Sequence, residues 1–166
     1  MNENSLLVLD KERIAFKMRR MAYEIWERNS DEQELTLIGI EHGGKILSDN
    51  LTEILREICP LVIHNIAITI NKKNHLNNAL DFEDNLSGRA IVLIDDVINS
   101  GKTIMYSLHA ILSFDIKKLM VAVLVDRKHK SFPISSDIVG HTISTTLQNR
   151  IDVKTEGNEI VGVYLA

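Results

Sequence analysis

The chain has 166 residues, of which 45% are hydrophobic and 25% are charged, and its formal net charge is −4. A chain of this length and composition is expected to form one domain with a sizeable hydrophobic core, with no reason to invoke disorder. The acidic balance, with a pI of about 5.9, argues against a protein whose main task is to hold nucleic acid, but it leaves room for a local basic patch.

Neither a signal peptide nor a membrane span is expected from the sequence. The first apolar run covers only residues 6–9, and no later window approaches the length needed to cross a bilayer. Cys59 is the single cysteine, so it cannot form an internal disulfide, and its helical apolar surroundings indicate a buried thiol. We therefore expect a cytoplasmic protein with a single domain over residues 1–166 and no membrane partner.

Hydrophobic periodicity predicts strands that alternate with helices. In chain order, the predicted elements are a strand at 6–9, a helix at 11–28 with Asp10 as its N-cap, a strand at 35–40, a helix at 46–58, strands at 61–70 and 91–94, a helix at 103–113, a strand at 118–125, a short strand at 137–139, and a hairpin of 150–153 with 160–165. This alternation requires right-handed crossovers and therefore a mainly parallel sheet with helices on both faces.

Six cations of the first predicted helix lie mostly away from its buried stripe. Their simplest interpretation is a solvated face, and a surface that faces RNA is the alternative. These residues are Lys11, Arg13, Lys17, Arg19, Arg20 and Arg28.

Two further segments suggest contact with anions. The turn after the second strand, residues 41–45, contains two glycines, which allow positive φ and a close approach of backbone amides to a ligand. Residues 71–89 form a long polar segment, typical of a lid from which Lys72, Lys73 and His75 could reach an anionic leaving group. An exposed loop with incidental charge is the alternative for the second segment.

The most informative stretch is IVLIDDVINSGKT, residues 91–103. Four apolar residues predict a buried strand, and Asp95 and Asp96 follow at its carboxyl end, where ligands bind in open α/β sheets. Adjacent carboxylates repel each other, and a sugar diol or a hydrated cation would satisfy them. An ordinary turn with a solvated acidic pair is the alternative.

The glycine loop that follows adds an anion site. A helix is expected to begin near Lys102 or Thr103, so the amides of residues 99–103 can point at an anion with support from the helix dipole. The nucleotide-binding pattern G-x-x-x-x-G-K-[ST] is excluded, because its first glycine would fall on Asp96. Carboxylates can bind sugar hydroxyls, and the neighbouring amides can bind a phosphate. This combination indicates a phosphorylated sugar as the ligand.

This stretch resembles the 5-phosphoribosyl-1-diphosphate (PRPP) signature of the type I phosphoribosyltransferases. Nearly the whole chain resembles one branch of that family, the bacterial pyrimidine-operon attenuation regulators with uracil phosphoribosyltransferase activity. The matching segments are VLD at 8–10, RMAYEIWERN at 20–29, LIGIEHGG at 37–44, VAVLVDRKHKSFPI at 121–134 and SDIVGHTIST at 136–145. The resemblance implies the type I fold, a three-layer α/β sandwich with a small antiparallel hairpin from the C-terminal tail, which either closes a sheet edge or builds a hood over the base.

The resemblance also implies a role for each motif. Asp95 and Asp96 would hold the ribose hydroxyls, and they are predicted to be catalytic together with Lys72 and Lys73, which would cover the leaving diphosphate. The remaining assignments are Ile98, Asn99, Ser100, Gly101, Lys102 and Thr103 for the 5-phosphate; Glu41, His42, Gly43 and Gly44 for the diphosphate loop; and Val125, Asp126, Arg127 and His129 for the base. Mg²⁺ would accompany PRPP near Asp95 and Asp96, held mainly by the substrate, so no dedicated metal ligands are expected.

The expected function is a PRPP-dependent nucleobase phosphoribosyltransferase, with uracil as the base in pyrimidine salvage and with a homodimer or higher oligomer as the assembly. One alternative is an RNA-binding regulator that senses nucleotides with the same pocket. The other is a PRPP-binding homologue with little catalysis. It is favoured by two departures from the regulators: His42-Gly43-Gly44 replaces Thr-Arg-Gly, and Asn71-Lys72-Lys73-Asn74 replaces Tyr-Arg-Asp-Asp.

Overall fold

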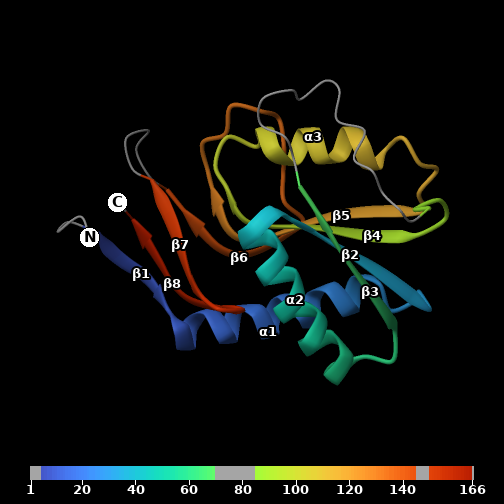
Figure 1. Ribbon diagram of the computed structural model, residues 1–166, viewed down its shortest axis with the longest axis horizontal. Coiled ribbons are helices and arrows are strands. Elements are labelled where there is room, and N and C mark those ends of the chain that lie inside the picture. Colours follow the sequence, from blue (N-terminus) through green and yellow to red (C-terminus); the bar gives the residue numbers. More distant parts are fainter. Residues whose placement is uncertain (1–4, 70–84, 145–149, 166) are drawn as a thin grey trace.

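The computed structural model describes residues 5–69, 85–144 and 150–165. Strands and helices alternate along most of these ranges, as the periodicity predicts (Figure 1). The elements are β1 (Leu6–Asp10), α1 (Lys11–Arg28), β2 (Glu34–Ile40), α2 (Glu41–Ile58), β3 (Val62–Ile68), β4 (Ala90–Ile98), α3 (Lys102–Ile111), β5 (Lys118–Arg127), β6 (Ile138–Ile143), β7 (Ile151–Glu156) and β8 (Glu159–Leu165).

Five strands form a parallel sheet in the order β3-β2-β4-β5-β6. β4 is the central strand, and its residues alternate between two apolar cores, because successive side chains of a strand point to opposite faces. Val92 and Ile94 belong to the core under α1 and α2, whereas Ile91 and Leu93 belong to the core under α3. The predicted α/β sandwich with a mainly parallel sheet is thus confirmed.

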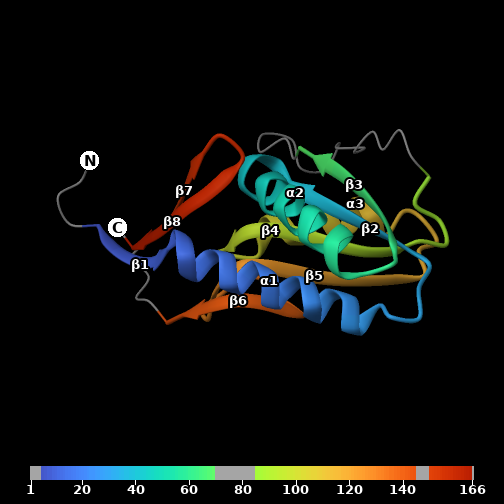
Figure 2. The same cartoon turned by 90° about the horizontal axis from the view of Figure 1, so that it is seen from below.

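The helices cover both faces of the sheet. α1 and α2 lie on one face and α3 lies on the other, as the two perpendicular views show (Figures 1 and 2). Asp10 is the N-cap of α1 as predicted, and its carboxylate accepts a hydrogen bond of 2.8 Å from the backbone N–H of Arg13. In the described ranges, no helix combines the length and the apolar character needed to cross a membrane.

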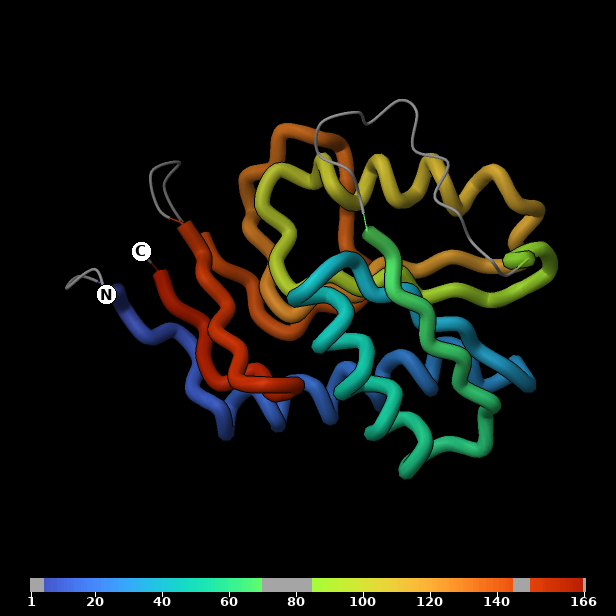
Figure 3. The backbone as a smooth tube through the Cα atoms, in the orientation of Figure 1, coloured from blue at the N-terminus to red at the C-terminus, as the bar shows by residue number. Residues whose placement is uncertain are grey.

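A second, smaller sheet joins the two ends of the chain. β7 and β8 form the predicted hairpin around Gly157, whose φ is +59°. β1 pairs antiparallel with β8, with Leu9 opposite Val163, so the order is β1-β8-β7 and the N- and C-terminal strands lie side by side (Figure 3). The sequence indicated each strand but gave no sign that β1 pairs with the hairpin.

Several element boundaries differ from the sequence-based expectation. β4 and β5 continue past their apolar runs, because Val97 and Ile98 of β4 still pair with Val125 and Asp126 of β5. α2 begins directly at Glu41, five residues earlier than predicted, so the segment expected to form a glycine turn is the first turn of a helix.

The N-cap of α1 can be tested by replacing Asp10 with alanine. This variant loses the acceptor for the Arg13 N–H, so we expect its free energy of unfolding to fall by about 1 kcal/mol. Urea denaturation followed by circular dichroism measures this change. Asp10→Asn keeps a capping oxygen and is the matched control; equal losses in the two variants would contradict the capping role.

Candidate functional site

The site lies where the direction of the sheet topology reverses. From β2 the chain continues through α2 to β3, and from β4 it continues through α3 to β5, on the opposite side. The carboxyl ends of β2 and β4 therefore border a crevice between diverging helices, which is the usual ligand site of an open α/β sheet. Pairing between β2 and β4 stops at Gly39 and Ile94, and the next residue of β4 is Asp95.

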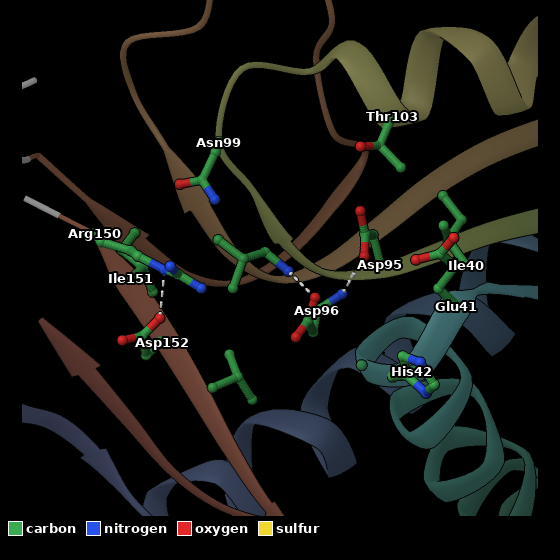
Figure 4. A pocket seen from close by; sticks show the side chains of 13 residues that line it. Ile40, Glu41, His42, Asp95, Asp96, Asn99, Thr103, Arg150, Ile151 and Asp152 are labelled. Atoms are coloured by element: carbon green, nitrogen blue, oxygen red, sulfur yellow. Dashed lines mark hydrogen bonds and ion pairs between the residues drawn. The ribbon is translucent and has the colours of Figure 1, made fainter. Parts of the chain in front are cut away.

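Asp95 and Asp96, the acidic pair, occupy this crevice with fixed orientations. Oδ1 of Asp95 accepts a hydrogen bond of 2.9 Å from the backbone N–H of Asp96, and Oδ1 of Asp96 accepts one of 2.8 Å from the N–H of Val97 (Figure 4). Both side chains are half-buried. These two bonds use only one oxygen of each carboxylate. The other oxygen can accept a hydrogen bond from a hydroxyl or contact a cation.

Asp95 retains a proton more readily than an isolated carboxyl group does. Loss of solvation, followed by the neighbouring charge of Asp96, raises the pKa of Asp95 well above its ordinary value of 3.8, and the carboxylate of Glu41 adds to the effect. A ligand that favours the charged form of the pair, such as a diol or a cation, will therefore displace a proton when it binds.

The N-terminus of α2 packs directly on the acidic pair. The chain turns at Glu41, whose φ of +40° is rare for a residue with a side chain, and the helix starts there. Gly43 and Gly44 are helical, so the expected positive φ was wrong for both, and the close approach of their amides to a ligand stays a prediction. They are needed for space: a Cβ at Gly43 would lie 2.1 Å from Oδ2 of Asp96, and one at Gly44 would lie 2.6 Å from the carbonyl oxygen of Ile94.

The segment from Ile98 to Thr103 forms the turn that leads into α3, and its role as an anion site stays a prediction. Gly101 has a φ of +81° and is the N-cap of α3 without a side-chain cap of its own, and the backbone N–H of Lys102 donates to Oγ of Ser100 at 3.3 Å. A small cavity of about 70 Å³ lies beside this turn, and its lining includes Asn99, Ser100, Gly101 and Thr103. The volume suits a single phosphate group beside the positive end of the α3 dipole.

The loop after β5 holds this turn in place from outside. Backbone N–H groups of Ser131 and Phe132 donate to the carbonyl oxygen of Ser100, at 3.2 and 3.0 Å. The same loop closes the space around Gly101, where an added Cβ would touch Phe132 and Ile134 at 3.4 Å. Glycine at position 101 thus serves both the backbone conformation and the packing.

A larger cleft of about 460 Å³ connects these parts. Its walls come from the end of β2 and the start of α2, from the acidic pair and the following turn, and from the start of β7. The lining residues are Ile40, Glu41, His42, Gly43, Asp95, Asp96, Val97, Asn99, Thr103, Arg150, Ile151, Asp152 and Val153. Figure 4 shows Glu41 and His42 on one side of the cleft and Arg150 and Asp152 on the other.

Arg150 and Asp152 are site residues that sequence reasoning missed. They form an ion pair of 2.7 Å between Nε and Oδ1 at the mouth of the cleft. Their only sequence signal was their place in a C-terminal hairpin that could form a hood, because nothing local connects residue 150 with residue 95.

Several other predicted residues are not among those that line the cleft. Val125 is fully buried, and Asp126 pairs with Lys130 at 2.7 Å; neither of them, nor Arg127 or His129, is among the residues that line it. Their role in base binding stays a prediction. Nζ of Lys102 lies 5.8 Å from the ring centre of Tyr106, and Lys102 does not line either cavity. Lys72, Lys73 and His75 lie outside the described residues.

In the part of the chain that the structure describes, no group of three or more His, Cys, Asp or Glu side chains is arranged to hold a metal ion. The acidic pair supplies oxygen donors of the kind that Mg²⁺ prefers, and the remaining ligands would have to come from a substrate or water. This donor set fits the expectation of a metal carried mainly by PRPP.

Residues 7–155 match the family model described as the phosphoribosyl transferase domain. The chain belongs to this family. It is 34% identical over 157 residues to the bifunctional protein PyrR of Fusobacterium nucleatum, with 89% of each chain covered. It is 36% identical over 155 residues to the protein of the same name from Leuconostoc mesenteroides, with 88% of this chain and 89% of the relative covered. The predicted resemblance to the type I phosphoribosyltransferases, within them to the bifunctional regulators, is thereby confirmed.

Solved structures confirm the fold of this phosphoribosyltransferase. The hypoxanthine phosphoribosyltransferase of Trypanosoma cruzi superposes with a TM-score of 0.80 at 18% identity, covering 94% of both chains. A hypoxanthine phosphoribosyltransferase from Staphylococcus aureus gives a TM-score of 0.72 at 14% identity, covering 83% of this chain and 77% of the other.

The raised pKa of Asp95 predicts how stability without ligand changes with pH. An acid whose pKa is raised by folding contributes stability below its unfolded pKa and loses that contribution as pH rises through the folded pKa. Asp95→Asn removes the charge and keeps an oxygen for the Asp96 N–H. We therefore expect this variant to exceed the wild type in free energy of unfolding at pH 7, by on the order of 1 kcal/mol or more, with the difference shrinking towards pH 4.

Urea denaturation at pH 4, 5.5 and 7 measures this difference. Asp96→Asn is the companion variant, because it removes the neighbouring charge that contributes to the raised pKa of Asp95. A pH-independent difference between Asp95→Asn and the wild type would contradict the assigned electrostatics.

Proposed function

We propose that this phosphoribosyltransferase transfers the phosphoribosyl group of PRPP to uracil, yielding the nucleoside 5′-monophosphate and diphosphate in cytoplasmic pyrimidine salvage. The observation that carries the proposal is the position of the acidic pair between the N-termini of α2 and α3, whose N-cap residues, Ile40 and Gly101, provide no side-chain cap. Helix N-termini bind anions, and carboxylates bind hydroxyls. The substrate that matches this order is a pentose with an anionic group at each end.

Each part of the cleft has a separate role in this proposal. The turn at residues 98–103 binds the 5-phosphate, Asp95 and Asp96 hold the ribose hydroxyls, and the first turn of α2 faces the diphosphate. The bond from N1 of uracil to C1 of the ribose forms as the bond from C1 to the diphosphate oxygen breaks; diphosphate keeps the electron pair, and the N1 proton is released. Such a displacement depends on orientation and charge stabilisation rather than on a protein nucleophile.

The leaving group requires positive charge that the start of α2 does not provide. Residues 41–44 contain no Lys or Arg, and Arg150 is the one Lys or Arg side chain among the described residues that line the cleft. Mg²⁺ bound to PRPP would neutralise part of the diphosphate charge, with Asp95 and Asp96 as the residues that would help to hold it. Lys72 and Lys73 are proposed to supply further cations over the diphosphate.

The choice of uracil rests on the relatives named PyrR and on the resemblance to the uracil-using regulators. The decisive assay incubates the protein with Mg²⁺, PRPP and, separately, uracil, hypoxanthine, guanine, adenine, xanthine or orotate. We expect nucleotide product with uracil, measured by chromatography. Asp95→Asn and Asp96→Asn should each weaken PRPP binding by about tenfold or more, because hydrogen bonds to charged groups are lost. No product from any base, in a protein that binds PRPP, would instead identify a PRPP-binding homologue without catalysis.

A second candidate function is the binding of RNA by a regulator that senses nucleotides in the same cleft. The observation that favours it is a group of three cations, Arg13, Lys17 and Arg20, which lies beside His141 where α1 meets β6. Burial and the charges of Arg20 and Arg13 lower the pKa of Lys17, and burial with Lys17 and Arg13 lowers that of His141. Cations that repel one another in this way gain from a bound polyanion.

Salt dependence tests this candidate. A polyuridylate 20-mer and a hairpin RNA would be titrated by fluorescence anisotropy at 50 to 300 mM salt, and the affinity should fall steeply as salt rises. Lys17→Gln and Arg20→Gln should each reduce the salt slope by about one, since each cation neutralises about one phosphate. Lys117→Gln, an exposed cation that pairs with Glu32, is the control. RNA binding that neither variant changes would exclude this surface as the RNA-binding site.

Light scattering of the same samples would show whether the protein is the expected homodimer or higher oligomer.

A further inference from the structure

The loop after β5 contacts the turn before α3 at two points. At the end of β5, Asp126 lies in register with Ile98, the residue at which the turn begins. Further along the loop, the backbone N–H groups of Ser131 and Phe132 donate hydrogen bonds of 3.2 and 3.0 Å to the carbonyl oxygen of Ser100. The loop and the turn therefore lie side by side over this length of chain (Figure 1).

An ion pair within the loop connects these two points. Nζ of Lys130 lies 2.7 Å from Oδ1 of Asp126, and the side chain of each residue is only 13% exposed. Asp126 lies beside Ile98 across β4 and β5, and Lys130 directly precedes Ser131 in the chain. Strand pairing, the ion pair and the bonds to Ser100 thus close a ring around the start of the turn.

The burial of this pair favours a geometric role over a role in overall stability. Two charges that leave water lose solvation, and this loss offsets much of their attraction, so a buried pair adds little net stability. Removal of one partner, however, leaves an unpaired charge where little water can reach it. The pair therefore holds the two ends of the loop segment together, and a loop with only one of the two charges has to open to solvate it.

The bonds to Ser100 determine the direction of the next amide. A trans peptide is planar, so the carbonyl oxygen of Ser100 and the N–H of Gly101 point in opposite directions. In the described ranges, no peptide bond is cis. Because the oxygen faces the loop, the N–H of Gly101 faces away from it, and Gly101 lines the small cavity of about 70 Å³. An anion bound by this amide depends on its orientation.

We propose that Asp126 and Lys130 are positioning residues for the 5-phosphate. The ion pair holds the loop, the loop holds the carbonyl oxygen of Ser100, and the rigid peptide then fixes the amide of Gly101. This inference rests on the proposed function, in which residues 98–103 bind the phosphate. Neither Asp126 nor Lys130 is among the residues that line the cleft or the small cavity, so both act through the turn.

Ribose 5-phosphate is the ligand for the test, because it reaches the turn and the acidic pair but carries neither a base nor a diphosphate. Its affinity would be measured by isothermal titration calorimetry for the wild type, Asp126→Asn and Lys130→Met. We expect both variants to bind it about tenfold more weakly, which is the effect of losing about one hydrogen bond to a charged group.

The shared direction of these two effects is the decisive result. Charge alone predicts opposite effects on an anionic ligand: loss of the negative charge of Asp126 tightens binding, and loss of the positive charge of Lys130 weakens it. Misalignment of the turn weakens binding in both variants. Tighter binding by Asp126→Asn would therefore overturn the positioning role.

Two further variants test whether the residues act as one unit. Lys130→Arg keeps the cation and should restore most of the wild-type affinity for ribose 5-phosphate. The double variant Asp126→Asn/Lys130→Met should bind no more weakly than either single variant, because changes to two residues in direct contact are not additive. Losses that add up in the double variant would contradict a shared role.

Lys128→Gln is the matched control. Lys128 is an exposed cation of the same loop, and its replacement removes the same charge as Lys130→Met does. The affinity for ribose 5-phosphate should stay at the wild-type value in this variant. An equal loss in the two lysine variants would assign the effect to the field of the loop and overturn the role of the ion pair.

Unfolding temperatures and steady-state kinetics distinguish two rival roles. A pair that serves only stability would lower the unfolding temperature and leave the affinity of the folded protein for ribose 5-phosphate unchanged. A direct contact of Asp126 with the base would raise the KM for uracil at saturating PRPP in Asp126→Asn, again with unchanged affinity for ribose 5-phosphate. Either result would overturn the proposal.

The wild type separates this inference from the proposed function. A wild type that binds neither ribose 5-phosphate nor PRPP contradicts the proposed function, and the role of the ion pair with it. A wild type that binds both, together with variants of unchanged affinity, contradicts the role of the ion pair alone.

Discussion

The contact between α2 and the end of β4 is the constraint on which the site depends. Gly43 and Gly44 leave no space for side chains, so the helix N-terminus lies directly against the acidic pair. The positive end of the helix dipole is thereby fixed beside two carboxylates that would otherwise repel each other freely. To reach this position the chain must turn within one residue, and Glu41 takes the unusual φ of +40° that this turn requires. Backbone strain and a raised pKa thus arise from one packing arrangement.

This arrangement makes the empty site electrostatically unfavourable and the occupied site favourable. Glu41, Asp95, Asp96 and Asp152 bring four acidic side chains to a cleft whose proposed substrate is itself strongly anionic. Two features would offset this repulsion without adding negative charge: a cation that accompanies the substrate, and the N–H donors of the helix N-termini. The proton that Asp95 retains would then be released on binding, so affinity for the sugar should rise with pH in the range where Asp95 titrates.

The sequence predicted the local structure of residues 91–103 because its signals are consecutive in the chain. The buried strand, the acidic pair and the glycine turn are consecutive, and hydrophobic period together with positive-φ glycine explains each of them. The predicted start of α2 was wrong because Gly43 and Gly44 suggested a loop. In the structure, the helix begins earlier, and contact with Asp96 and the end of β4 excludes side chains at these two positions. The pairing of β1 with β8 and the entry of Arg150 into the cleft depend on residues more than 50 positions apart, for which periodicity contains no information.

The two halves of the cleft differ in how the fold holds them. The acidic pair and the α3 turn are built into the central strand of the parallel sheet and are braced by the loop after β5, so few substitutions are compatible with their geometry. The wall of residues 150–153 comes from a small sheet at the chain ends, where the side chain of Arg150 is 82% exposed and pairs with Asp152. Side chains on this wall can change without disturbing the core. The two sides of the cleft thus differ in how strongly the packing of the core restricts their side chains.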